Sequence, residues 1–336
     1  MTTEIFFSSN KLGTITDKQL QLVLDRFHLG ELITSEKTVN GVGNQTLFIS
    51  STAGEYVLKG NPLFAGQFIE EKFYVDNLLE ITNLPVPSPY LVDESKDIFG
   101  WSYAIMPRLQ GRHLNESGFA AALGRKDQEQ IAELLAVTIS KLHRWKVAQY
   151  GEFDPVTQKI RPFEGSYKIW LYNRIRYWLE DAKQYSVITT VDMEWVEQLL
   201  TASEHVFHSL SWPTFVMGDF KADNLLVQQG DNGWEISGIF DFTTGYFGDG
   251  IADLPRIVAM YLDDGKEELA KLFIRTYLHC MEAKDGFVER FRVHMLHQRV
   301  LDWGCAKATH DVTWDQDMPF STWAERFTDF TAEWLS

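Results

Sequence analysis

The sequence has little cysteine and no long apolar run. Only Cys280 and Cys305 are cysteines, and neither stands in a CxxC pair, which argues against a disulfide framework or a cysteine-rich zinc site. No apolar run approaches the roughly 20 residues that a membrane-spanning helix needs. The N-terminal stretch MTTEIFFSSNKLG has neither the basic nor the apolar region of a secretory signal. We therefore expect a cytoplasmic protein with no membrane partner.

Basic side chains are also scarce relative to acidic ones. Lys and Arg number 31 against 47 Asp and Glu, a formal net charge of −16. This balance argues against nucleic acid or an anionic membrane surface as a partner. It is compatible with a cationic small molecule, although many cytosolic proteins are simply acidic. The sequence does not indicate an oligomeric state.

Aromatic residues make up 14% of the whole sequence, which predicts a large core rich in rings.

The first third of the chain is predicted to form a small β-rich unit. Residues 16–27 have the apolar spacing of a helix, and residues 64–80 form a second helical stretch before the proline-marked loop 84–89. Strand-like segments and a glycine-containing turn, GVGN at 41–44, surround these helices; the strands are expected at 31–40, 47–50, 56–59, 90–93 and 101–106.

Beyond residue 107 the pattern is mostly helical. Amphipathic stretches are interrupted by one predicted hairpin, 224–227 and 234–240, joined by the turn QQGDNG. The helices are expected at 127–145, 167–185, 193–210, 266–281, 287–308 and 322–334. The sequence therefore predicts an α+β fold of two lobes, a β-rich lobe over residues 1–107 and a larger helical lobe over residues 108–336.

Polar residues gather at the ends of the predicted hairpin. The stretch VMGDFKADNLLV, residues 216–227, places Asp219 and Asn224 before its first strand, and Asp241 follows its second strand. These side chains are expected to converge. Carboxylate and amide oxygens suit Mg²⁺, and a carboxylate that does not bind metal can accept a proton from a hydroxyl. Asp219 and Asn224 alone would more often be an ordinary polar turn.

Lys59 ends the third predicted strand, and two glutamates lie on the helix that follows it. A lysine held by a glutamate and aimed at phosphates is the other half of a phosphoryl-transfer site. Glu71 is preferred to Glu70 as the partner, because of its spacing to the apolar Val75 and Leu78. Without such a partner, an exposed strand lysine is the ordinary interpretation of Lys59.

Taken together, these motifs resemble the aminoglycoside phosphotransferase family, which has a protein-kinase-like fold. The resemblance follows family order over roughly residues 30–260 and rests on Lys59, Glu71 and five motifs. These are LPVP at 84–87, MPRLQG at 106–111, LH at 142–143, GDFKADN at 218–224 and IFDFTTGYFGDGIADL at 239–254. Protein kinases share D-x4-N, but LPVP and GDGIADL favour the small-molecule branch.

The resemblance implies a role for each matched residue. Asp219 is expected to accept the proton of the acceptor hydroxyl, and Asn224 and Asp241 to hold Mg²⁺. Lys59 is expected to contact the phosphates of ATP or GTP while paired with Glu71. The segment 105–108, beginning with Ile105 and Met106, is expected to be a hinge whose backbone binds the base. Asp253 is expected to brace the catalytic loop.

Two residues of the catalytic loop depart from the family pattern. Met217 occupies the position before Gly-Asp where the family usually has His, from which we expect altered packing rather than lost activity. Lys221 resembles the catalytic-loop Lys of protein kinases. It is interpreted either as a contact to the γ-phosphate or as a solvated charge.

Several other polar residues have ordinary explanations. His294 and His297 lie three apart on a predicted helix, but no third metal ligand is apparent, which favours a surface or packing role; His143 is expected to be packed in the core. The acidic Asp302, Asp311, Asp315 and Asp317 would either receive a cationic substrate or form a solvated face.

The predicted activity is ATP- and Mg²⁺-dependent phosphorylation of a hydroxyl on a small molecule, such as an aminoglycoside or another cationic compound. One alternative keeps this chemistry with choline, homoserine, a sugar, a macrolide or a protein side chain as acceptor. The other is a nucleotide-binding pseudokinase that acts as a scaffold. The presence of Lys59, Asp219, Asn224 and Asp241 together argues against the scaffold.

Overall fold

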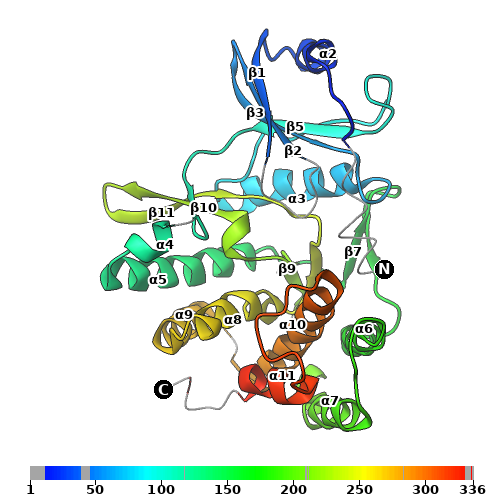
Figure 1. Ribbon diagram of the computed structural model, residues 1–336, viewed down its shortest axis with the longest axis vertical. Helices are drawn as coiled ribbons and strands as arrows, with labels where there is room; N and C mark the ends of the chain where they lie inside the picture. Colours follow the sequence, from blue (N-terminus) through cyan, green and yellow to red (C-terminus); the bar gives the residue numbers. More distant parts are fainter. Residues whose placement is uncertain are drawn as a thin grey trace.

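The computed structural model describes residues 12–38, 46–116, 118–208, 210, 212–282, 284–329 and 334. Within these residues an antiparallel sheet with helices is followed by a largely helical part, which confirms the predicted α+β, protein-kinase-like architecture (Figure 1). The expected GVGN turn at 41–44 lies outside the described residues. The last strand of the first sheet ends at Pro107. The division into lobes at that point stays a prediction.

The first sheet has a helix on each face. Its described strands lie in the order β1-β2-β3-β5-β4, all antiparallel, and they are β1 (Leu32–Lys37), β2 (Thr46–Ser51), β3 (Gly54–Gly60), β4 (Leu91–Asp93) and β5 (Tyr103–Pro107). Alternate residues, including Leu58 and Ile105, pack against helix α2 (Asp17–Phe27). Helix α3 (Gln67–Thr82) lies on the other face (Figure 1). Thr16 caps α2, accepting a hydrogen bond from the backbone N–H of Gln19.

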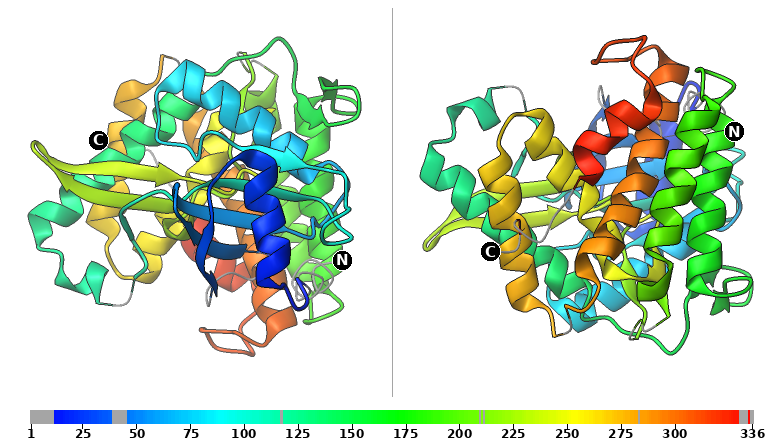
Figure 2. Two further views of the ribbon diagram at one scale, coloured as in Figure 1. Left: turned by 90° about the horizontal axis from the view of Figure 1, so that it is seen from above. Right: turned by 90° about the horizontal axis from the view of Figure 1, so that it is seen from below.

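The part of the chain after Pro107 is mostly helical and also contains two small sheets. Its helices are α4 (Phe119–Ala122), α5 (Arg125–Leu142), α6 (Tyr167–Ala182), α7 (Thr190–Ala202), α8 (Pro255–Asp263), α9 (Glu267–Cys280), α10 (Phe287–Thr309) and α11 (Phe320–Thr328), with 3-10 turns η1 (Glu204–Phe207), η2 (Ala222–Asn224) and η3 (Gly250–Asp253). Figure 2 shows α10 beside α6 at the centre of this part. None of the helices in the described ranges combines the length and apolar character needed to cross a bilayer.

The predicted hairpin is present, but the other short strands that follow Pro107 were not predicted. The hairpin strands β10 (Leu225–Gly230) and β11 (Gly233–Ile239) pair in a sheet with β6 (Arg112–His113). The other sheet has the order β8-β7-β12-β9, formed by β7 (Gly151–Asp154), β8 (Lys159–Pro162), β9 (Thr214–Val216) and β12 (Tyr246–Gly248). Strands of three or four residues are too short to show an alternating pattern. Helix α8, which follows η3 directly, was not among the helices predicted from apolar spacing.

These two sheets fix the positions of two loops. Val216, at the end of β9, pairs with Tyr246, the first residue of β12. Leu225, the first residue of β10, pairs with Ile239, the last of β11. The loops 217–224 and 240–245 both connect these two sheets. They lie side by side, because a strand pair joins them at each end. Most of the polar residues singled out in the sequence lie on them.

Candidate active site

Asp219 lies at the centre of the first loop and contacts three polar side chains. The amide Nδ2 of Asn224 donates to the backbone oxygen of Asp219 at 2.9 Å and to the Oδ2 atom of Asp219 at 3.0 Å. Lys221 Nζ lies 2.8 Å from Oδ2. Arg256 Nε lies 2.9 Å from Oδ1, close enough for an ion pair but without hydrogen-bond alignment. The carboxylate is therefore held by charges on both sides.

Lys59 connects the first sheet to the second loop. Its Nζ donates to Glu71 Oε1 at 2.8 Å and to Asp241 Oδ1 at 2.9 Å. The hydroxyl of Thr243 donates to Glu71 at 2.7 Å, and Tyr90 donates to Glu71 at 2.9 Å. Burial opposes the charge of Lys59, but the two carboxylates outweigh it and hold the pKa of Lys59 above its ordinary value. The predicted Lys59–Glu71 ion pair is thus present.

Glu70 and Glu71 have different surroundings although they are adjacent. Glu71 points at Lys59, whereas Glu70 accepts a hydrogen bond from the Tyr74 hydroxyl at 3.0 Å. Burial away from a cation raises the pKa of Glu70 to about 7. The preference for Glu71 as the lysine partner therefore agrees with the geometry.

Asp241 has an unusual backbone conformation. Its φ is 68°, in the left-handed region that residues with side chains seldom adopt. Its carboxylate is still 41% exposed. Burial again opposes the charge, but Lys59 and Thr243 hold the pKa of Asp241 below its ordinary value, so the group stays ionised. A strained residue that presents a charged group to an open space is typical of functional sites.

The loop before Asp219 is held through its backbone. Asp253 accepts hydrogen bonds from the backbone N–H groups of Met217 at 2.8 Å and Gly218 at 2.7 Å. The Thr244 hydroxyl donates to the Met217 carbonyl at 3.0 Å, and His143 Nε2 lies 3.1 Å from Asp253. Asp253 therefore braces the loop as expected. Because these bonds use the backbone, they do not need a histidine at Met217, whose side chain is fully buried.

Gly218 is required by its surroundings. Its φ is 76°, and a Cβ there would lie 2.4 Å from the carbonyl oxygen of Thr244. Only glycine allows the two loops to approach so closely at this point.

The two residues proposed for the hinge are not equivalent. Ile105 pairs with Leu58 of β3 and with Leu91, the first residue of β4, so strands flank it on both sides. Met106 pairs with Val57 of β3, and the β4 ladder ends before it. An adenine or guanine ring needs backbone groups that no strand already uses. Met106 fits this task better than Ile105, and the hinge stays a prediction.

The arrangement of donors fits a magnesium nucleotide. The Nδ2 atom of Asn224 is engaged with Asp219, which leaves Oδ1 for a cation. Asp241 supplies an ionised carboxylate, and Phe240 is held beside Asn224 by a 3.2 Å backbone hydrogen bond. Mg²⁺ prefers one or two such oxygens together with phosphate oxygens and water. Lys59 lies beside Asp241, where it would meet phosphates.

Sequence reasoning missed two residues that contact the predicted set. Arg256, the second residue of α8, lies against Asp219, and Thr243 contacts Lys59, Glu71 and Asp241. No spacing rule points to Arg256, because it comes from a helix that the sequence pattern did not reveal. Thr243 stands two residues after Asp241 in DFTTG and carried no signal of its own.

His143 lies in the core, as expected. His143 and His294 are buried, and His294 Nε2 lies 3.1 Å from Asp249. No group of three or more His, Cys, Asp or Glu able to hold a metal occurs among the described residues. The burial of His294 beside Asp249 agrees with a packing role.

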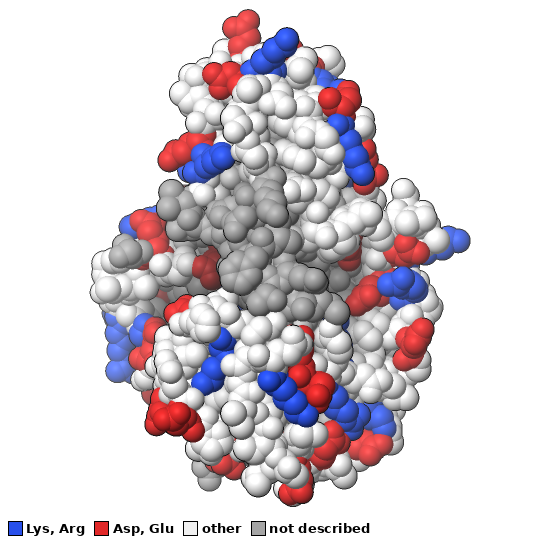
Figure 3. Space-filling view, turned by 45° about the vertical axis from the view of Figure 1, so that its right-hand side comes forward, with Lys and Arg blue, Asp and Glu red and all other residues white. Residues whose placement is uncertain are grey.

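The predicted acidic residues do not form one patch. Asp302 is paired with Arg299, whereas Asp311, Asp315 and Asp317 are exposed. On the face drawn in Figure 3, acidic and basic side chains alternate over the lower, helical part.

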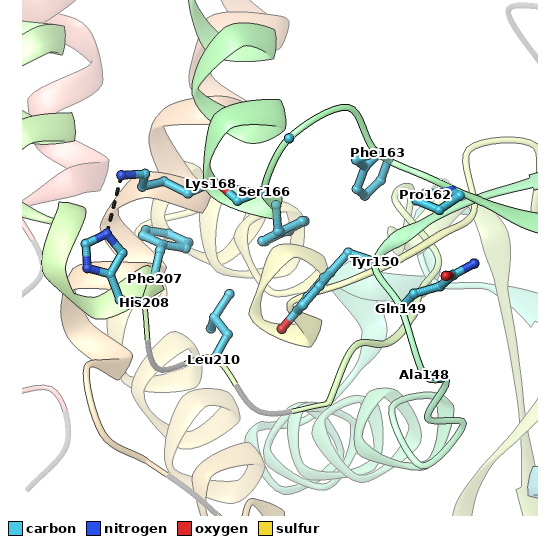
Figure 4. Close-up of a pocket in the computed structure, with 12 residues that line it drawn as sticks. Ala148, Gln149, Tyr150, Pro162, Phe163, Ser166, Lys168, Phe207, His208 and Leu210 are labelled. Atoms are coloured by element: carbon cyan, nitrogen blue, oxygen red, sulfur yellow. Dashed lines mark hydrogen bonds between the residues drawn. The ribbon is translucent and has the colours of Figure 1, made fainter.

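A cavity of about 410 Å³ lies away from the Asp219 loop. Its walls come from the segment before β7, the end of β8 and the start of α6, and they include Tyr150, Phe163 and Lys168 (Figure 4). Lys168 Nζ lies 3.4 Å from His208 Nε2. None of the predicted catalytic, metal or nucleotide residues lines this cavity.

Comparison with solved structures supports the fold. A crystal structure of aminoglycoside phosphotransferase APH(4)-Ia superposes with a TM-score of 0.62 at 17% identity, covering 94% of this chain and 97% of that one. The GDP complex of aminoglycoside 2'-phosphotransferase-IIIa gives 0.60 at 15% identity, covering 93% and 96%. At such low identity the likeness shows the fold alone. Other structures of APH(4)-Ia mutants are complexes with ADP or AMP-PNP and hygromycin B.

Sequence relatives match this chain over only part of their length. Acyl-CoA dehydrogenase family member 11 of Rattus norvegicus is 23% identical over 235 residues, 68% of this chain but 28% of that protein. Homoserine kinase of Burkholderia mallei is 31% identical over 103 residues, 29% of this chain and 30% of that enzyme. The chain thus spans less than a third of these relatives. A sequence model described as "Phosphotransferase enzyme family" matches residues 36–288, and the chain therefore belongs to that family.

Proposed function

We propose that the protein transfers the γ-phosphoryl group of ATP or GTP to a hydroxyl of a small molecule. The observation that carries this proposal is the contact between the two loops, which are joined by the backbone bond from Phe240 to Asn224 at 3.2 Å and the Thr244 hydroxyl bond to Met217 at 3.0 Å. Asp219 and Asn224 lie on one loop, Asp241 lies on the other, and Lys59 reaches Asp241 at 2.9 Å. A proton acceptor, a metal ligand pair and a phosphate-binding lysine are the parts that phosphoryl transfer needs.

Each side chain would have a separate task. Asp219 would orient the acceptor hydroxyl and accept its proton. Asn224 and Asp241 would hold Mg²⁺, which neutralises phosphate charge when bound. Lys59, fixed by Glu71, would contact the phosphates nearer the base. Lys221, 2.8 Å from Asp219, would contact the transferred phosphoryl group.

The comparisons support a small-molecule acceptor without identifying it. Structural neighbours include aminoglycoside phosphotransferases, and one partial sequence relative is homoserine kinase. An aminoglycoside is a polycation, whereas homoserine carries both charges, so these candidates predict different surroundings for the acceptor. The pseudokinase alternative is disfavoured, because Lys59, Asp219, Asn224 and Asp241 are all present and in contact through the two loops.

The test is phosphate transfer by the full chain with ATP or GTP and Mg²⁺. A panel of aminoglycosides, macrolides and metabolite alcohols serves as acceptors, and Asp219→Ala is compared with Asp231→Ala at the exposed tip of the hairpin. We expect transfer to at least one alcohol and a loss of roughly 10²- to 10⁴-fold in Asp219→Ala only. If the wild type and Asp219→Ala both show the same negligible transfer, the proposed phosphotransferase activity is refuted.

A further inference from the structure

The two oxygens of the Asp219 carboxylate have different surroundings. Oδ2 receives the 3.0 Å hydrogen bond from Asn224 and lies 2.8 Å from Lys221 Nζ. Oδ1 is buried and has no hydrogen-bond partner among the described residues, and Arg256 Nε lies 2.9 Å from it. An acceptor hydroxyl that approaches this carboxylate therefore has to reach Oδ2.

The backbone of Arg256 is tied to the same loop as Asp219. Arg256 is the second residue of α8, and α8 follows η3, which ends at Asp253. The carboxylate of Asp253 accepts hydrogen bonds from the backbone N–H groups of Met217 and Gly218, at 2.8 and 2.7 Å. One carboxylate thus joins the start of α8 to the segment before Asp219, which fixes the backbone of Arg256 relative to that of Asp219.

The far end of the Arg256 guanidinium faces a second carboxylate. Its Nη1 lies 3.9 Å from Asp302 Oδ1, and Asp302 is itself held by Arg299 and by a 2.8 Å hydrogen bond from Gln298. Burial opposes the charge of Arg256, but Asp219 and Asp302 outweigh it and raise the pKa of Arg256 above its ordinary value. Arg256 is therefore a cation anchored between two carboxylates, one of which is the expected proton acceptor.

Lys221 contacts the same carboxylate but is anchored at one point only. Among the described residues its ion pair is with Asp219 alone. An ammonium on a flexible four-carbon stem can turn towards a phosphate, whereas a planar guanidinium held at both ends keeps its place. Of the two cations beside Asp219, Arg256 is thus the one able to fix the carboxylate throughout the reaction.

We propose that Arg256 is a positioning residue, which holds Oδ1 of Asp219 and thereby keeps Oδ2 turned towards the acceptor hydroxyl. Without it, rotation of the Asp219 side chain would move Oδ2 away from the hydroxyl. A displacement of about 1 Å at a reacting group can lower the rate roughly 100-fold. The inference rests on the proposed phosphotransfer and adds to it a residue that no sequence motif indicated.

The test measures phosphate transfer by the full chain with Mg²⁺, using the best acceptor of the panel and separate titrations of nucleotide and acceptor. The variants are Arg256→Gln, Arg256→Lys, Asp219→Asn and the double variant Arg256→Gln/Asp219→Asn. Arg176→Gln is the matched control, because Arg176 is an exposed arginine paired with Glu197. Circular dichroism checks that each variant folds, and Arg256→Lys carries the comparison if Arg256→Gln does not.

We expect Arg256→Gln to lower kcat roughly 10- to 100-fold. The KM values for nucleotide and acceptor should change less than about 3-fold, because Arg256 contacts neither. Arg256→Lys should restore part of kcat, since it keeps a positive charge beside Oδ1. Adding Arg256→Gln to Asp219→Asn should cause no further loss, because Arg256 acts through the Asp219 carboxylate. Arg176→Gln should behave as wild type.

Two kinetic results would overturn the inference. A rise in either KM with kcat unchanged would make Arg256 a substrate contact. A double variant whose loss multiplies the two single losses would make Arg256 a residue that only supports the fold.

A crystal structure of Arg256→Gln, or of Arg256→Lys in its place, gives an independent answer. We expect Asp219 to leave its wild-type rotamer in Arg256→Gln and to shift less in Arg256→Lys, and an unmoved Asp219 would overturn the inference. Failure of the proposed function looks different, because then no alcohol is phosphorylated beyond the Asp219→Ala background. The crystal structure still decides the role of Arg256 in that case.

Discussion

Lys59 and Arg174 are both partly buried cations, but they differ in what lies against their charge. Lys59 is bound by Glu71 and Asp241, whereas Arg174 has no carboxylate partner among the residues that the structure describes. A partly buried cation in this protein is therefore either paired with carboxylates, as Lys59 is, or stacked on an aromatic ring, as Arg174 is on Trp170.

The largest effect is expected when the carboxylate of Asp241, the partner of Lys59, is removed. Asp241→Asn keeps the shape but removes the carboxylate that is expected to bind Mg²⁺. A metal supplies several kcal/mol of transition-state stabilisation, so transfer should fall roughly 10²- to 10³-fold. Measuring the rate over a range of Mg²⁺ concentrations checks this.

Asp231→Asn, at the exposed tip of the hairpin, is the control for that measurement and should leave the Mg²⁺ dependence unchanged. If Asp241→Asn keeps the wild-type Mg²⁺ dependence, Asp241 does not hold the metal.

The next largest effect is the difference between Lys59 and Arg174 in what their removal costs in free energy of unfolding. Lys59→Met leaves the buried carboxylate of Glu71, 3% exposed, without its counter-ion. Breaking such a pair costs about 3 kcal/mol, and the double variant Lys59→Met/Glu71→Gln should recover part of that loss. Arg174→Gln removes a cation that has no carboxylate to leave behind, so its cost should be under about 1 kcal/mol. Urea unfolding of all three variants tests the contrast, which fails if Lys59→Met and Arg174→Gln cost the same.

The surroundings of Lys59 could be predicted from the sequence, whereas those of Arg174 and Arg256 could not, for a physical reason. Lys59, Glu71, Asp219, Asn224 and Asp241 stand at the ends of strands or on a short loop, where local spacing fixes their positions. A hairpin brings its two ends together whatever surrounds it, so the convergence of Asn224 and Asp241 could be predicted.

Arg174 and Arg256 lie on the helices α6 and α8. The contacts of each arginine depend on how its helix packs against α10. No spacing along the chain encodes that packing. The same reasoning explains the missed sheet of β7, β8, β9 and β12. Its strands are too short for a periodic pattern, and β12 pairs with β7 and β9, which lie far from it in the sequence.

The smallest expected effect concerns Glu70, a carboxylate on the Lys59 side that lacks the cation its neighbour has. Burial raises its pKa from the ordinary 4.5 to about 7, so the folded protein holds this proton more tightly than the unfolded chain does. The associated stability is present below pH 4.5 and is lost as the pH rises through about 7. Glu70→Gln cannot ionise and keeps an oxygen for the Tyr74 hydroxyl. It should therefore be more stable than the wild type by about 1 to 2 kcal/mol at pH 8 and equal to it near pH 5. Urea unfolding at both pH values measures this difference, with the exposed Glu80→Gln on the same helix as control. A Glu70→Gln gain that is the same at pH 5 and pH 8 would mean that Glu70 does not titrate as its burial requires.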